Sequence, residues 1–244
     1  MTASISHVIA TRLSRVPPFE RGLTLGDFLV PIRLGERAAI WQRNLLMVLV
    51  GTALMIVGAY VSFDVPSFAI GDIYIPANPY VPMTLQTLSA LLVGATLGAR
   101  RGFASTGLYL LLGCIGLPVF ALNQLGTHES SYRQIASIVD GQLVLGTTGG
   151  YLIGFVVAAS LVGRLAELGW DRKLRGSVAA MAIGNVVIFA IGVTWLAIAA
   201  SLSVPDALLY GLWPFLPGEV VKLIVAAGLL PIGWRLVARR DHDL

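Results

Sequence analysis

Two opposite charges, Glu219 and Lys222, lie inside the apolar stretch PFLPGEVVKLIV of residues 214–225. Residues three apart share one face of a helix. A lysine at the centre of a membrane helix costs roughly 2.5–3.5 kcal/mol, so such residues usually pair, line a cavity and serve function. At a ligand site, the lysine would attract a carboxylate and the glutamate would accept hydrogen bonds from N–H groups. The alternative is an internal ion pair, with the lysine extending only to the outer interface.

Two other stretches place polar or aromatic side chains where an apolar run begins. NPYVPMTLQTL, residues 78–88, carries Thr84, Gln86 and Thr87, and GTTGGYLIGF, residues 146–155, carries Tyr151. The tyrosine ring could stack on a flat ligand and offer its hydroxyl. Polar side chains in membrane helices also bond the backbone or a neighbour, and tyrosine is common at membrane interfaces. We expect these side chains to face the same side of the membrane as Glu219, which favours a shared pocket.

The composition predicts that these stretches belong to an integral membrane protein. Of 244 residues, 56% are hydrophobic and only 12% are charged, whereas soluble domains carry about 25% charged residues. Apolar runs of about 20 residues are typical of membrane helices. We therefore predict an all-α fold with six transmembrane helices in one bundle, at residues 45–63, 83–99, 103–122, 142–163, 178–201 and 217–234.

The basic residues between these runs predict the orientation of the chain. Of the 17 lysines and arginines, 15 lie before the first run, between the second and third, between the fourth and fifth, or after the sixth. The opposite side has only Arg133. By the positive-inside rule, both termini are cytoplasmic. The net charge of +4 is thus a topology signal, and we expect no nucleic-acid partner.

The predicted membrane domain covers residues 45–237. Residues 1–44 would form a cytoplasmic N-terminal extension, and the stretch at residues 28–46, which runs from it into the first span, could lie along the membrane surface as an interfacial helix. Residues 238–244 would be a cytoplasmic tail.

The absence of several motifs argues against an enzyme. The sequence contains no phosphate-binding GxxxxGK[ST] loop, so we do not expect ATP hydrolysis by this chain. The three histidines, His7, His128 and His242, lie outside the apolar runs, which argues against a histidine metal site in the membrane. Glu219 is the only acidic residue within a run, so no carboxylate pair is available for acid–base chemistry. We expect neither a cofactor nor a metal.

Glycines spaced by four residues suggest close helix packing. Gly94, Gly98 and Gly102 form one series, and Gly150 and Gly154 begin another. Small residues at this spacing let membrane helices approach closely. The contacts would lie within the bundle or, alternatively, form a docking face for another membrane subunit.

The polar stretches, in their order along the chain, resemble the BioY family, the biotin-specific substrate-binding components of energy-coupling factor (ECF) transporters. The matching text is VPMTLQTLSALLVGATLGARRG, LYLLLGCIGLPVFA, GTTGGYLIGF and WPFLPGEVVK, and the resemblance covers about residues 45–237. It implies six membrane helices in a prokaryotic plasma membrane and biotin bound near the outer face. It also implies two kinds of partner, a transmembrane coupling protein and cytoplasmic ATPase subunits.

The resemblance carries over to individual residues. The implied substrate-binding residues are Thr84, Gln86, Asn123, Tyr151, Glu219 and Lys222. Glu219 stands where the family has an aspartate, one methylene shorter. The loop at 123–141 is longer and more polar than usual, and would act as a lid or only decorate the surface. Residues 45–63 lack the Ala-x-x-x-Ala pair on which such components often dock. Two alternatives stay open: a different vitamin, or a membrane subunit in which Glu219 and Lys222 form only an internal ion pair.

Overall fold

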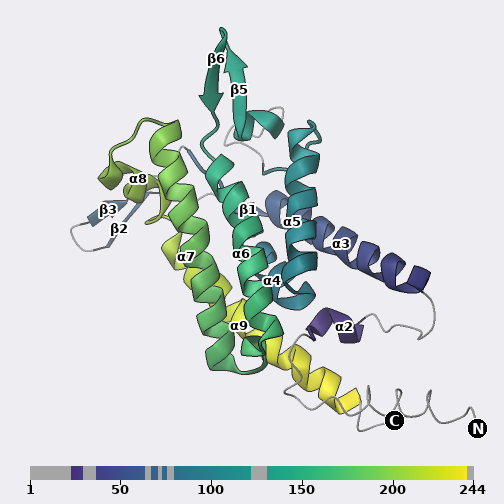
Figure 1. Ribbon diagram of the computed structural model, residues 1–244. Coiled ribbons are helices and arrows are strands. Elements are labelled where there is room, and N and C mark those ends of the chain that lie inside the picture. Colours follow the sequence, from purple (N-terminus) through teal and green to yellow (C-terminus); the bar gives the residue numbers. More distant parts are fainter. Residues whose placement is uncertain are drawn as a thin grey trace, which may run out of the picture.

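The computed structural model describes residues 23–29, 37–63, 67–70, 73–75, 80–121 and 131–240. Most of these residues are helical (Figure 1). The α-helices are α2 (Leu25–Leu29), α3 (Arg37–Tyr60), α4 (Gln86–Leu97), α5 (Ala99–Cys114), α6 (Gly149–Glu167), α7 (Leu174–Ala199), α8 (Val204–Gly211) and α9 (Leu216–Arg240). Two 3-10 turns, η1 (Ser131–Gln134) and η2 (Trp170–Arg172), precede β5 and α7.

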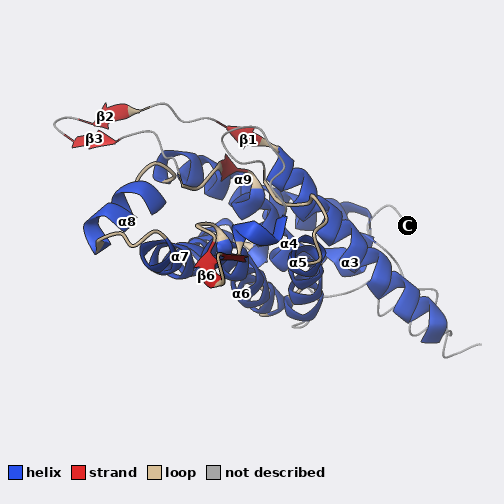
Figure 2. Cartoon of the chain, turned by 90° about the horizontal axis from the view of Figure 1, so that it is seen from above, coloured by secondary structure: helices blue, strands red, loops and turns tan. Residues whose placement is uncertain are grey.

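Helix α6 packs against α4, α5 and α7, while α9 lies against α7 and α4. Viewed from the end that carries β5 and β6, α3 and α8 lie on opposite sides of the bundle (Figure 2).

The glycines spaced by four residues allow neighbouring helices to approach closely. A Cβ atom at Gly94 would lie 2.3 Å from the carbonyl oxygen of Ala159, and one at Gly154 would lie 3.1 Å from Cα of Ile188. Packing within the bundle, the first of the two interpretations, is therefore confirmed for these glycines.

Four helices within the described residues are long and apolar enough to cross a membrane: Ile40–Tyr60, Gly149–Glu167, Leu174–Ala199 and Leu216–Ala238. They correspond to four of the six predicted spans. The runs at 83–99 and 103–122 instead form the shorter helices α4, of 12 residues, and α5, of 16 residues. At 1.5 Å per residue these helices are about 18 and 24 Å long, against a hydrocarbon core of about 30 Å.

The residue between the two short helices explains where α4 ends and α5 begins. Gly98 adopts φ +86, which ends α4 one residue before α5 begins. Glycine suits this position because its φ lies in the left-handed region. Arg100 and Arg101, expected in a loop, therefore belong to the first turn of α5.

The all-α prediction missed three short antiparallel strand pairs among the described residues. These pairs are β1 (Ser62–Phe63) with β4 (Met83–Thr84), β2 (Phe68–Ile70) with β3 (Ile73–Ile75), and β5 (Ala136–Val139) with β6 (Gln142–Leu145). Residues 142–145, predicted to begin a membrane helix, are instead β6. Asp140 and Gly141 both have positive φ and make the tight turn of this β5–β6 hairpin, which projects from one end of the bundle (Figure 1).

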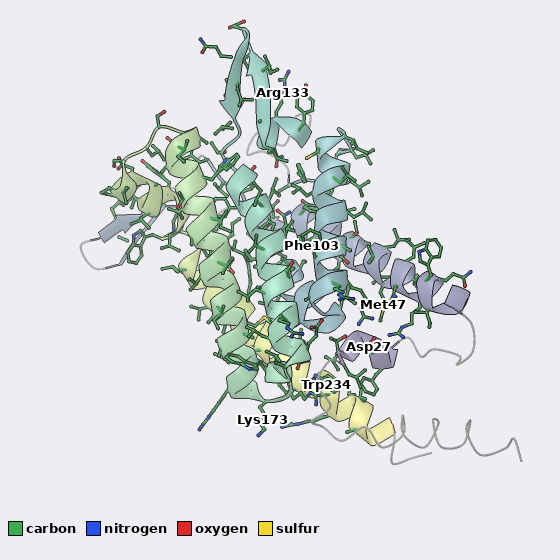
Figure 3. The ribbon with its side chains drawn as sticks, viewed as in Figure 1. Asp27, Met47, Phe103, Arg133, Lys173 and Trp234 are labelled. Carbon is green, nitrogen blue, oxygen red and sulfur yellow. The ribbon has the colours of Figure 1, made fainter. Side chains whose placement is uncertain are left out.

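A cluster of ionic contacts closes the opposite end of the bundle, where Figure 3 shows Asp27 and Lys173. Two nitrogens of Arg101 lie 2.8 and 2.9 Å from the Asp27 carboxylate, which also accepts hydrogen bonds from Arg43 and Thr24. Burial alone would raise the pKa of Asp27, but these hydrogen bonds, with Arg101 foremost, hold it below its ordinary value. The contacts join α2 to α3 and α5.

Asp171, in η2, is a buried acid at the same end. Its side chain accepts a hydrogen bond of 2.6 Å from the indole nitrogen of Trp234. Its other carboxylate oxygen has no hydrogen-bond partner among the described residues. Burial, which disfavours the charged form, raises the pKa of Asp171 to about 6.

This raised pKa predicts a pH dependence of stability. Folding favours the protonated form of Asp171. The contribution of Asp171 to the free energy of unfolding is therefore greatest at low pH, and it is lost as pH rises through the folded-state pKa of about 6. Between pH 5 and 7.5 we expect a loss of roughly 1 kcal/mol, a few degrees in the thermal midpoint. Asp171→Asn keeps an acceptor for Trp234 without the charge and should flatten this dependence. Equal slopes for parent and variant in detergent would contradict the prediction.

Candidate functional site

Glu219 and Lys222 lie in the first two turns of α9 and are 4% and 8% exposed. The ammonium nitrogen of Lys222 is 2.7 Å from Oε1 of Glu219. The spacing of three residues brings them together because both side chains leave the same helix face. The ion pair that the sequence analysis gave as the alternative to a ligand site is thus present, and it is buried.

Strand β4 and the first turn of α4 supply further partners for this ion pair. Lys222 Nζ donates to the backbone carbonyl of Thr84 at 2.6 Å and to the hydroxyl of Thr87 at 3.1 Å. The Thr87 hydroxyl in turn donates to Glu219 Oε1 at 2.7 Å. Glu219 Oε2 is buried and has no hydrogen-bond partner within the part of the chain that the structure describes. A buried carboxylate oxygen without a partner costs free energy, so it is suited to accept a hydrogen bond from a ligand.

Thr84 and Gln86 organise the start of α4. The Thr84 hydroxyl accepts a hydrogen bond from the Gln86 backbone nitrogen at 3.2 Å and lies 3.4 Å from the side-chain oxygen of Gln86. The Gln86 amide nitrogen donates to the hydroxyl of Tyr109 on α5. Both side chains are buried. These contacts fix the Gln86 side chain in one orientation at the cavity wall.

Tyr151, on α6, contributes its ring to the cavity, but its hydroxyl donates to the carbonyl of Gly211 at 2.7 Å. The hydroxyl that we expected to serve a ligand is therefore already used. The ring packs edge-on against Phe189, with centroids 6.1 Å apart, and lies 6.4 Å from the ring of Phe215. A Cβ atom at Gly192 would lie only 2.4 Å from the tyrosine ring. Tyr151 thus belongs to a fixed aromatic wall.

These side chains surround a cavity of about 470 Å³. This space includes solvent at the mouth of the cavity. Its lining combines polar side chains with apolar and aromatic ones, as small-molecule sites do. The structure brings five of the six predicted residues to its lining; Asn123 lies outside the described residues. The lining is Val81, Pro82, Thr84, Gln86, Thr87, Ala121, Gln134, Thr148, Tyr151, Leu152, Phe155, Phe189, Phe215, Glu219 and Lys222.

Several lining residues were not among the six predicted. Thr87 and Thr148 lie in stretches that the sequence had marked, and their hydroxyls were the available signal. Phe189 lies in the middle of the apolar helix α7, where nothing in the sequence distinguishes it from a packing residue. Phe189 and Glu219 also line a larger, mostly apolar groove of about 1520 Å³ between α7, α8 and α9.

The polar loop before α6 contributes Gln134 to the cavity. The side-chain amide nitrogen of Gln134 donates to the carbonyl of Ala121 at 2.7 Å, and the backbone carbonyl of Gln134 accepts a hydrogen bond of 3.1 Å from the Thr148 hydroxyl. A Cβ atom at Gly146 would lie 2.3 Å from Gln134, so the base of the β5–β6 hairpin is tightly packed. The described part of this loop is therefore more than a surface decoration.

The BioY family model matches residues 35–239. A biotin transporter BioY of Thermotoga maritima is 34% identical over 186 residues, which are 76% of this chain and 92% of the relative. One of Rhizobium etli is 34% identical over 170 residues, which are 66% of this chain and 83% of the relative.

A solved structure shares the fold. It is the crystal structure at 2.1 Å of the S-component for biotin from an ECF-type ABC transporter. The match has a TM-score of 0.60 and 23% sequence identity, and it covers 81% of this chain and 93% of the other.

Proposed function

This chain belongs to the BioY family, and from this premise we propose that it takes up biotin as the substrate-binding component of an ECF transporter. The observation that carries the proposal is the buried Glu219–Lys222 pair on the wall of the cavity. Biotin has a fused ring with ureido N–H groups and a carboxylate on an aliphatic chain. An acceptor, a cation and an apolar wall are the three features that such a molecule requires.

We propose that biotin binds with its aliphatic chain folded back, so that its carboxylate pairs with Lys222 while its ureido N–H groups bond to Glu219. Gln86 and Thr84, which line the same wall, assist the ureido ring together with Asn123. The fused ring packs near Tyr151. Oε2 of Glu219, which has no hydrogen-bond partner among the described residues, supports the ureido contact because it is an acceptor with unused capacity.

The same proposal includes the topology. The four long helices α3, α6, α7 and α9 and the two shorter ones, α4 and α5, would all cross the plasma membrane of a prokaryotic cell, with both termini in the cytoplasm and the cavity near the outer face. Supporting this orientation, Asp27, Arg43, Arg101 and Lys173 gather at the bundle end opposite the β5–β6 hairpin (Figure 3). Since the sequence has no ATP-binding loop, a transmembrane coupling protein and cytoplasmic ATPase subunits would supply the energy.

Equilibrium binding of biotin to the purified chain in detergent tests the function. We expect saturable binding, with dethiobiotin and biotin amide as competitors. Biotin amide lacks the charge that pairs with Lys222, so it should compete about 10- to 100-fold more weakly than biotin. Folded protein that binds no biotin would contradict the proposal, and equal competition by the amide would contradict the role of Lys222.

Glu219 in place of the family's aspartate favours one second candidate, the same transporter class with another vitamin. A side chain one methylene longer would place its acceptor differently in the cavity and so favour a different ring. Displacement of labelled biotin by other vitamins separates the two. A vitamin that displaces biotin at lower concentration than biotin itself would establish the second candidate.

A further inference from the structure

The ammonium group of Lys222 has no N–H left for a ligand in this structure. A lysine has three donors, and here they meet the Thr84 carbonyl, the Thr87 hydroxyl and Glu219 Oε1. If the substrate carboxylate is to pair with Lys222, one of these three acceptors must give up its hydrogen bond. This requirement rests on the proposed function, and it concerns Thr87, to which that function assigns no role.

Two of the three acceptors are poorly suited to leave. The Thr84 carbonyl lies 2.6 Å from Lys222 Nζ and belongs to β4, where Thr84 pairs with Ser62 of β1. This carbonyl can move only if the chain leading into α4 moves with it. Glu219 Oε1, at 2.7 Å, carries the charge that balances the buried lysine. Removing that partner would leave two buried charges apart, which is strongly unfavourable.

The Thr87 hydroxyl is different in three respects. Its contact with Nζ is the longest of the three, at 3.1 Å. It is a neutral side-chain group, so losing it leaves the ion pair intact. It also donates to Glu219 Oε1 at 2.7 Å, and this second bond persists when Lys222 turns to another acceptor.

We infer that Thr87 is a positioning residue with an exchangeable bond: its hydroxyl occupies the third donor of Lys222 until the substrate carboxylate takes that donor. Throughout the exchange, Thr87 continues to donate to Glu219 Oε1. That bond keeps Oε2, the carboxylate oxygen without a partner, available for a ligand N–H. The difference in binding free energy between a carboxylate and an amide therefore includes the cost of displacing the Thr87 hydroxyl.

The ratio of the dissociation constants of biotin amide and biotin tests this inference. Thr87→Val keeps the shape of the side chain but removes the hydroxyl, so the carboxylate no longer has a competitor. We expect the ratio to rise about threefold to tenfold over the parent, the equivalent of one hydrogen bond. Looser positioning of Glu219 weakens both ligands alike and cancels in the ratio. Thr87→Ser retains the hydroxyl and should restore the parent ratio.

Thr96→Val is the matched control, because Thr96 lies on the same helix and its hydroxyl donates to the Leu92 carbonyl of its own turn, away from the ion pair. Its ratio should equal that of the parent. If Thr87→Val does not fold, Thr87→Ala provides the same comparison with a smaller side chain. An unchanged or lower ratio in the folded variant would overturn the inference. A parent that does not bind biotin would instead refute the proposed function.

Discussion

Replacing Lys222 with methionine is expected to weaken biotin binding by at least about 100-fold. Methionine keeps the apolar stem but removes the partner of the substrate carboxylate, and it leaves Glu219 as a buried charge 4% exposed. Removing one partner of a buried charge pair between two binding partners costs about 2–5 kcal/mol, and a loss near 3 kcal/mol corresponds to a factor of more than 100. Equilibrium binding of labelled biotin in detergent measures the loss.

Two further variants separate binding from folding. Lys173→Met removes an exposed lysine at the opposite end of the bundle and should bind biotin like the parent. The double variant Glu219→Gln with Lys222→Met has no unpaired buried charge, so its thermal midpoint should recover while biotin binding stays lost. If Lys222→Met binds biotin as tightly as the parent, Lys222 is not in the binding site.

Gly94→Leu is expected to lower the free energy of unfolding by about 3 kcal/mol or more, the largest loss of stability that we predict. Even the Cβ atom would lie 2.3 Å from the carbonyl oxygen of Ala159 and 2.8 Å from its Cα. These atoms are backbone, so the clash is relieved only by moving α4 away from α6. Because both helices line the cavity, biotin binding should weaken with stability.

Gly107→Leu is the control for this substitution, since a Cβ atom at Gly107 meets nothing within 4 Å. It should leave the thermal midpoint within about 2 °C of the parent, since surface substitutions usually change stability by less than 0.5 kcal/mol. A Gly94→Leu protein as stable as Gly107→Leu would show that α4 and α6 do not need this close approach.

Much of the site followed from local patterns. Glu219 and Lys222 meet because a helix brings residues three apart to one face, and that geometry is a property of the chain segment alone. The glycines at spacing four predicted close packing for the same reason, and Gly94 and Gly154 confirm it. The prediction from short apolar runs was weaker. Residues 142–145 formed a strand instead of a helix, because a short run of apolar residues fits either structure.

The sequence by itself determined the membrane character, the buried ion pair and most of the polar side chains of the cavity, because composition and helical spacing act along the chain. Only the tertiary structure decided which partners these side chains find. Thr87 bonds to Glu219 across 132 residues of sequence, and Tyr151 gives its hydroxyl to Gly211, 60 residues away. Such bonds depend on how α4, α6 and α9 pack together, and no local pattern carries that information.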